Sequence, residues 1–170
     1  MADSFSERNS PSVGLLISVL VRYPEIASVH YDHKDQSLRF SLLLAQPLEK
    51  DDASSLRSRI DSSLEAYFHL EHRRPVINEL SLRTYEDITV VELKRDVASI
   101  TQEEISMVTE IVKDSFSGEL VVERGDSFGD DDPALQEEMI EEMLDDLRQS
   151  KQQRNLVAFR EEGRVLVYNK

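Results

Sequence analysis

Four histidines are the residues of this chain whose type and spacing could do chemistry. They form two His-x-x-His pairs, His30 with His33 and His69 with His72. Imidazole nitrogens are ligands for zinc and nickel, and a neighbouring carboxylate such as Asp32 could complete the coordination. Residues three apart share one face of a helix, so the second pair can point in the same direction. The four histidines therefore define a hypothetical zinc or nickel site.

The same histidines also have a purely structural interpretation. His69 and His72 lie at the predicted C-terminal end of a helix, where the helix dipole favours positive charge. His30 and His33 belong to a predicted hairpin, where polar side chains are ordinary surface residues. The pairs match no recognised metal-ligand spacing. Both interpretations remain open from the sequence alone.

Carboxylates are concentrated in a single block. Residues 126–146 contain ten acidic and no basic side chains, so the rest of the chain carries only −4 of the net charge of −14. Several of these acids, from Asp126 to Glu137, fall on ligand positions of an EF-hand count. Asp131 occupies the turn position that requires glycine, so the register of a calcium loop fails. The block is therefore expected to be an acidic, solvated segment followed by the outer face of a helix.

Nucleophilic and phosphate-binding chemistry lacks the motifs it requires. The chain has no cysteine, no serine in a Gly-x-Ser-x-Gly elbow, and only five glycines, none of which form a phosphate-binding loop. The sequence therefore favours a non-enzymatic protein over an enzyme.

Hydrophobic periodicity predicts the elements that would position these residues. In chain order they are an apolar helix (12–23), strands 26–31 and 38–44, a helix (52–72), strands 77–85 and 88–93, a helix (101–116), a strand (119–123), a helix (133–150) and strands 156–160 and 165–168. Thr101 and Glu104 form a capping box at the start of one helix, and Asp132 with Pro133 suits the start of another.

The order of these elements predicts an α+β fold. From residue 38 to residue 123 it is β, α, β, β, α, β, the ferredoxin-like order, which implies an antiparallel sheet with two helices on one face. The first helix and strand are N-terminal additions, and a helix plus a β-hairpin is added at the C-terminus. The predicted organisation is a disordered N-terminus (1–10), an α+β core domain (11–124), an acidic linker (125–132) and a helix–hairpin appendage (133–170).

Charge and hydropathy narrow the classes of partner. A nucleic-acid or anionic-membrane surface needs clustered lysine and arginine, whereas the largest charge cluster here is acidic. The most apolar run, Val13 to Val21, is too short to span a bilayer and lacks the basic leader of a signal peptide. We therefore expect a cytoplasmic protein that binds neither nucleic acid nor membranes.

The C-terminal unit is expected to need a partner surface. A helix plus a two-stranded hairpin is too small to be stable alone, and the hairpin strands are apolar on both faces. The unit must pack on the core domain or pair with a second copy of the chain. Its basic end and the neighbouring acidic block could also attract each other across a dimer. We predict a homodimer, with a self-packed monomer as the alternative.

The helix over 133–150 is the predicted surface for another protein. Methionine side chains adapt to varied partners, and acidic side chains accelerate association with a basic partner. The predicted partner-binding residues are Met139, Met143, Leu147, Glu138 and Glu142. The alternative is that the apolar stripe packs internally and the acids only solvate the outer face.

The sequence thus predicts a small acidic protein with a non-enzymatic interaction or regulatory role, self-associating through its C-terminal helix and hairpin. The main alternative is a metal-binding protein or metal-dependent enzyme that uses His30, His33, His69 and His72. A third class, a sensor that binds small molecules at an interface between such sheets, rests on fold analogy alone.

Overall fold

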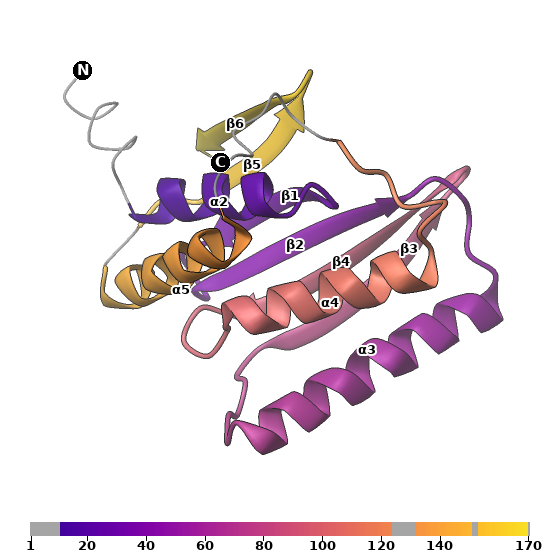
Figure 1. Cartoon of the computed structure of the whole chain (residues 1–170), viewed down its shortest axis with the longest axis horizontal. Helices are drawn as coiled ribbons and strands as arrows, with labels where there is room; N and C mark the ends of the chain where they lie inside the picture. The colour runs from indigo at the N-terminus through magenta and orange to yellow at the C-terminus, as the bar shows by residue number, and fades with distance from the viewer. Residues whose placement is uncertain (1–10, 124–131, 151–152, 170) are drawn as a thin grey trace.

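The computed structural model describes residues 11–123, 132–150 and 153–169. Within them the chain forms four helices and six strands (Figure 1). In chain order these are α2 (Pro11–Arg22), β1 (Ile26–Asp32), β2 (Ser37–Leu44), α3 (Lys50–Leu70), β3 (Asn78–Tyr85), β4 (Ile88–Asp96), α4 (Gln102–Ser115), α5 (Pro133–Gln149), β5 (Leu156–Glu161) and β6 (Arg164–Asn169).

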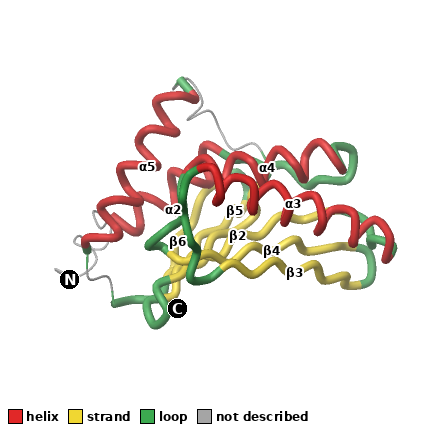
Figure 2. The backbone as a smooth tube through the Cα atoms, turned by 90° about the horizontal axis from the view of Figure 1, so that it is seen from below, coloured by secondary structure: helices red, strands yellow, loops and turns green. Residues whose placement is uncertain are grey.

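All six strands belong to one antiparallel sheet with the order β3-β4-β2-β1-β5-β6. Figure 2 shows the helices on one side of this sheet, with α3 and α4 over one half and α2 and α5 over the other. The opposite side carries no helix among the described residues. We call it the helix-free face.

Alternation along the strands explains why only one face is covered. On β2 the side chains of Leu38, Phe40, Leu42 and Leu44 point to the helices and are buried. The residues that alternate with them include Ser37, Arg39 and Ser41, whose side chains point to the helix-free face. Because one face of β2 is apolar and the other largely polar, the apolar core lies on the helix-covered side of this strand.

The α+β prediction is confirmed, and the predicted elements recur within a few residues of their expected ends. One predicted strand is wrong. Residues 119–123 form a single isolated bridge, between Leu120 and Leu44, in place of a strand. The reason is that β1 already pairs with β2 from Ile26 to Asp32, so only the end of β2 is left for a further partner.

Two predicted helix starts are confirmed in atomic detail. At the start of α4 the Glu104 main-chain N–H donates to the Thr101 hydroxyl, and the Thr101 N–H donates to the Glu104 carboxylate at 2.8 Å. At the start of α5 the Ala134 N–H donates to the Asp132 carboxylate at 3.1 Å. Each contact satisfies a main-chain donor that the first helical turn leaves open.

The C-terminal helix and hairpin join the rest of the fold. The β5 strand pairs with β1, so the hairpin extends the central sheet. The α5 helix packs along α2, with Ile140, Leu144 and Leu147 buried. Burial of this stripe against α2 gives the apolar side of α5 a partner within the same chain.

Parts of two predictions lie outside the described residues. The disordered N-terminus was predicted over 1–10, and most of the acidic linker with its EF-hand-like acids falls in 124–131. Within the ranges that the structure does describe, none of the helices combines the length and apolar composition needed to cross a bilayer.

Candidate functional site

The outer edge of β6 is the first feature that could bind a partner. The β5–β6 turn has positive φ at Glu162 (51°) and Gly163 (80°), as in the two-residue turn that suits a twisted hairpin. In such a hairpin the residues flanking the turn bond to each other, and every second residue points its peptide groups outward. On β6 these outward residues include Val165 and Val167. The strand therefore offers main-chain donors and acceptors to a further strand.

The opposite edge of the sheet, β3, is protected. By the same alternation Leu80 points its peptide groups outward, and the Arg57 guanidinium of α3 donates to the Leu80 carbonyl at 2.9 Å. Exposed charged side chains, Glu79 and Arg83, also lie on this strand. Charged residues and a covering group are devices by which proteins prevent edge-to-edge pairing. On β6 only Arg164 is charged.

Apolar side chains adjoin the β6 edge on the helix-free face. Val157 and Phe159 of β5 lie beside Tyr168 and Leu166 of β6. The Phe159 and Tyr168 rings are stacked, with centroids 5.6 Å apart and planes 20° apart. Tyr168 remains 52% exposed, so the patch is only partly covered within one chain.

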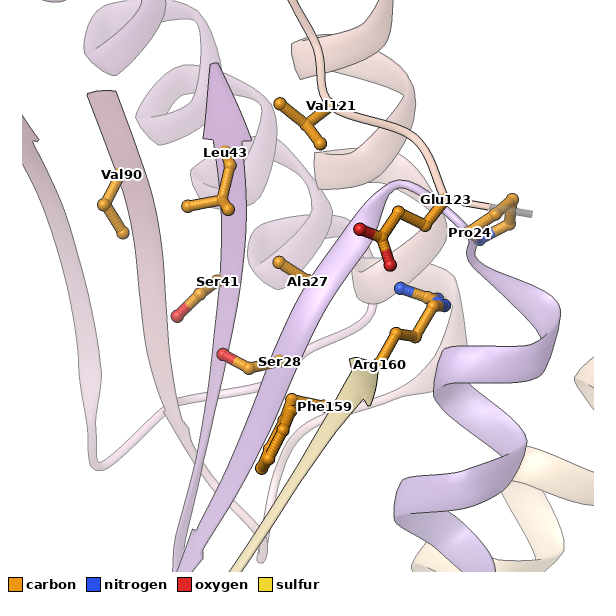
Figure 3. Close-up of a pocket in the computed structure, with 10 residues that line it drawn as sticks. All are labelled: Pro24, Ala27, Ser28, Ser41, Leu43, Val90, Val121, Glu123, Phe159 and Arg160. Carbon is orange, nitrogen blue, oxygen red and sulfur yellow. The ribbon is translucent and has the colours of Figure 1, made fainter. Parts of the chain in front are cut away.

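A groove lies on the same face, where β1 bends. The register of β1 against β2 shifts between Ile26 and Ser28, which makes Ala27 the extra residue of a β-bulge. The groove next to this bulge has a volume of about 380 Å³ (Figure 3). Its lining consists of Pro24, Ala27, Ser28, Ser41, Leu43, Val90, Val121, Glu123, Phe159 and Arg160.

Arg160 closes one end of the groove and also caps α2. Its guanidinium donates to the main-chain carbonyls of Leu20, Tyr23 and Ile26, the bond to Tyr23 measuring 2.7 Å. These carbonyls lie at the end of α2 and the start of β1, where the helix leaves acceptors open and its dipole favours a cation. Arg160 thus links β5 to the α2–β1 connection.

The charge of Arg160 has no close acidic partner. Burial lowers the pKa of its guanidinium, and the nearby charges of Glu123 and Glu25 act in the opposite direction. Among the described residues no carboxylate lies within ion-pair distance of it. Glu123 faces Arg160 across the end of the groove (Figure 3).

The histidines of the predicted metal site do not gather. Within residues 11–123, 132–150 and 153–169, no three His, Asp or Glu side chains are grouped as a metal ion would require. His33 is bonded to the residue before β5: its Nδ1 lies 2.6 Å from the Asn155 side-chain oxygen, which also accepts from the His33 N–H. His30 lies on the helix-free face of β1, between β2 and β5.

The second histidine pair ends a helix. His69 and His72 are exposed at the C-terminus of α3, and His72 has a positive φ of 53°. The His72 N–H donates to the carbonyl of His69, and the Arg73 N–H donates to that of Phe68. These two bonds form the Schellman motif, which satisfies the last helical carbonyls. The structure thus gives His72 a role in the main chain.

The predicted partner-binding residues of α5 divide between two sides of the helix. Leu147 is buried, and Met143 is half-buried, with its sulfur accepting from the Ser18 hydroxyl at 3.4 Å. Met139, Glu138 and Glu142 are exposed. Of the five predicted partner-binding residues, only these three are exposed to another protein.

A second, shallower hollow lies between α4 and α5. It is lined by Gln102, Glu103, Ser106, Met107, Glu110 and Glu137. Beside it the Tyr23 hydroxyl lies 2.5 Å from the Ser106 hydroxyl and accepts from the Gln102 side chain at 2.6 Å. Burial raises the pKa of Tyr23, although these two hydrogen bonds lower it. These contacts hold α2 to α4, so we assign them a structural role.

The most deeply buried charges are also structural. The Arg95 side chain, 0% exposed, donates to Glu104 at 2.8 Å and to Asp96 at 2.5 Å. Its guanidinium carbon lies 5.0 Å from the centre of the Phe68 ring. The network joins the end of β4 to the start of α4, and none of the three charged groups reaches either hollow.

Sequence reasoning missed Arg160, Glu123 and the groove. The sequence does contain one signal, an arginine at the end of an otherwise apolar strand, Leu156 to Phe159. Its target carbonyls lie more than a hundred residues away, so only the folded chain identifies them. Comparison of the chain with protein-family models, curated proteins and solved structures found no match.

Proposed function

We propose that this protein is a non-enzymatic interaction protein that works as a homodimer, formed by pairing of β6 with β6 of a second copy. The observation that carries the proposal is the contrast between the two sheet edges. The β3 edge is protected by Arg57, Glu79 and Arg83, whereas β6 is apolar apart from Arg164 and, within the part of the chain that the structure describes, has no strand paired to its outer edge. Unprotected edges of this kind are templates for strand addition.

A twofold axis suits this edge. Antiparallel strands related by a twofold axis present the same residues to each other, so one strand serves as both partners. Val165 and Val167 would supply the new main-chain hydrogen bonds. Leu166 and Tyr168 of both copies would meet on the helix-free face and extend the patch that Phe159 begins.

The proposal assigns self-association to the hairpin and not to α5. The buried stripe of α5 is occupied by α2, which leaves Met139, Glu138 and Glu142 on its outer face. We propose these three as the contact for a basic protein partner, since acidic side chains attract it at long range. A cytoplasmic location is part of the same proposal.

We further propose that the chain from β2 to α4 follows the ferredoxin-like plan. The strand order β3-β4-β2 supports it, as does the bridge between Leu120 and Leu44, which lies where the last strand of that plan would pair. In this interpretation β1 has replaced most of that last strand.

Matched tyrosine variants test the dimer. Tyr168 and Tyr85 are each 52% exposed and lie on β6 and β3, the two edge strands. Light scattering of the wild type should give twice the 19.5 kDa mass of one chain. Tyr168→Lys should weaken the dimer at least about tenfold, because it places two like charges near the axis. Tyr85→Lys should leave the mass unchanged.

A main-chain variant gives a second test. Val167→Pro removes an N–H that points away from the hairpin, so the hydrogen bonds of β5 with β6 remain while the outer edge loses a donor. The matched control is Leu82→Pro, which removes an outward N–H from β3. The proposal is contradicted if the wild type is monomeric at about 100 μM, or if the Tyr168 and Val167 variants dimerise as well as their controls.

A further inference from the structure

The end of the groove presents one positive and one negative side chain that face each other without pairing. Among the described residues, Arg160 and Glu123 are the only charged ones in the lining, and they form no ion pair with each other (Figure 3). A ligand that carries both charges can satisfy the two groups at once. A ligand with a single charge would leave one of them without a counter-charge.

Main-chain contacts hold the Arg160 guanidinium and the segment that precedes Glu123. Three carbonyls hold the Arg160 guanidinium, which leaves two of its five N–H donors for a ligand. Glu123 follows a segment that is bonded to the end of β2, where the Val121 N–H donates to the Leu43 carbonyl at 2.8 Å and the Ala45 N–H to the Glu119 carbonyl at 2.7 Å. Preorganised groups lose little conformational entropy when a ligand binds.

The remaining lining is suited to an apolar body. Ala27, Leu43, Val90, Val121 and Phe159 contribute hydrocarbon walls. Two serine hydroxyls, on neighbouring positions of β1 and β2, add polar groups to the floor. A volume of about 380 Å³ falls within the range of small-molecule sites, which is roughly 300 to 1,000 Å³.

We propose that this groove binds a free α-amino acid with an apolar side chain. The carboxylate accepts hydrogen bonds from Arg160, the ammonium group donates to Glu123, and the side chain packs against Leu43, Val90 and Phe159. The two charges of a free amino acid are separated by one carbon atom, which matches two groups that face each other at one end of a groove. Peptides carry these charges at opposite ends and cannot satisfy both groups in this way.

Three related compounds test the charge requirement. Leucine carries both charges, 4-methylpentanoate keeps only the carboxylate, and 3-methylbutylamine keeps only the ammonium group. Titration calorimetry with the full chain should show leucine binding at least about tenfold more tightly than either analogue, the effect of one charge-assisted hydrogen bond. Equal affinity for leucine and an analogue overturns the proposal, as does absence of leucine binding up to about 10 mM.

A matched pair of variants tests the assignment of Glu123. Glu123→Gln should weaken leucine binding about tenfold without weakening the binding of 4-methylpentanoate, because only leucine has an ammonium group that donates to Glu123. Glu161→Gln, an exposed β5 residue outside the groove, should change neither affinity. Unaltered leucine affinity in Glu123→Gln contradicts the assignment. The site does not depend on the dimer, so Val167→Pro should bind leucine like the wild type.

Discussion

At the scale of single residues, the charged groups of this protein fall into two kinds. Arg95, Glu104 and Asp96 are buried and bonded to each other, and a buried pair is costly to break because one partner keeps its charge without compensation. Arg160 and Glu123 line a groove and are not paired. Burial alone therefore does not separate the two kinds of charge; what distinguishes them is whether a group of opposite charge lies within ion-pair distance.

Asp96 should make the stability of the protein depend on pH. Burial raises the pKa of its carboxyl, but hydrogen bonds from Ser99 and Ile77 and the charge of Arg95 outweigh this and lower it below the usual value. The stabilisation is therefore present above the usual aspartate pKa of about 3.9 and is lost as the pH falls through the lower folded value.

The variant Asp96→Asn tests this residue. At pH 7 we expect it to reduce the free energy of unfolding by about 1 to 3 kcal/mol, because charged hydrogen bonds are lost. The difference from the wild type should shrink as the pH falls below about 4, since the Asp96 carboxyl becomes neutral first in the unfolded wild type and, at lower pH, in the folded protein. Urea unfolding at each pH measures it, and a difference that stays constant would contradict the role assigned to Asp96.

At the scale of elements, α5 shows why an amphipathic helix does not identify its own partner. Its apolar stripe was predicted either to bind another protein or to pack internally, and both outcomes follow from the same pattern. In the structure α2 covers Ile140, Leu144 and Leu147. Met139 is left at 42% exposed, on the side that faces away.

Two alanine variants of α5 separate its two sides. Leu144→Ala should lower the free energy of unfolding by about 2 to 5 kcal/mol, because it leaves a cavity against α2. Met139→Ala should change it by less than about 0.5 kcal/mol, as surface substitutions usually do. Urea unfolding gives both values. Similar small effects for the two variants would mean that α5 does not depend on α2 for its burial.

At the scale of the whole molecule, the net charge opposes self-association. Each chain carries −14, so two copies repel, whereas β6 itself holds a single charged residue, Arg164. Dimerisation through this edge depends on main-chain bonds and apolar contacts, which salt does not weaken. Attraction between the acidic block and the basic C-terminal end would instead be weakened by added salt, because salt screens opposite charges from each other.

Ionic strength therefore distinguishes the two modes of assembly. If β6 pairs with β6, raising the salt from about 20 to 300 mM should tighten the dimer, because it screens the repulsion between like-charged chains. Sedimentation at several protein concentrations measures the dissociation constant. A dimer that weakens with salt would instead favour association of oppositely charged segments.

The sequence by itself determined the helices and strands that the structure describes, the two capped helix starts and the location of the acidic charge. The strand that it predicted over 119–123 was wrong. The correct predictions depend on local periodicity and on contacts within a few residues. The capping box of Thr101 and Glu104 is such a contact, because both partners lie within one helical turn.

Only the tertiary structure decided which strand lies beside β2, which face of α5 is covered, and which charges remain unpaired. Each of these depends on contacts between distant segments. The β1 strand pairs with β2 where residues 119–123 were expected, and Arg160 reaches carbonyls of α2 across the fold. Hydrophobic patterns state that a surface must be covered, but several segments of similar pattern compete to cover it. Packing of the whole chain selects among them, and so places Arg160 and Glu123 at one groove.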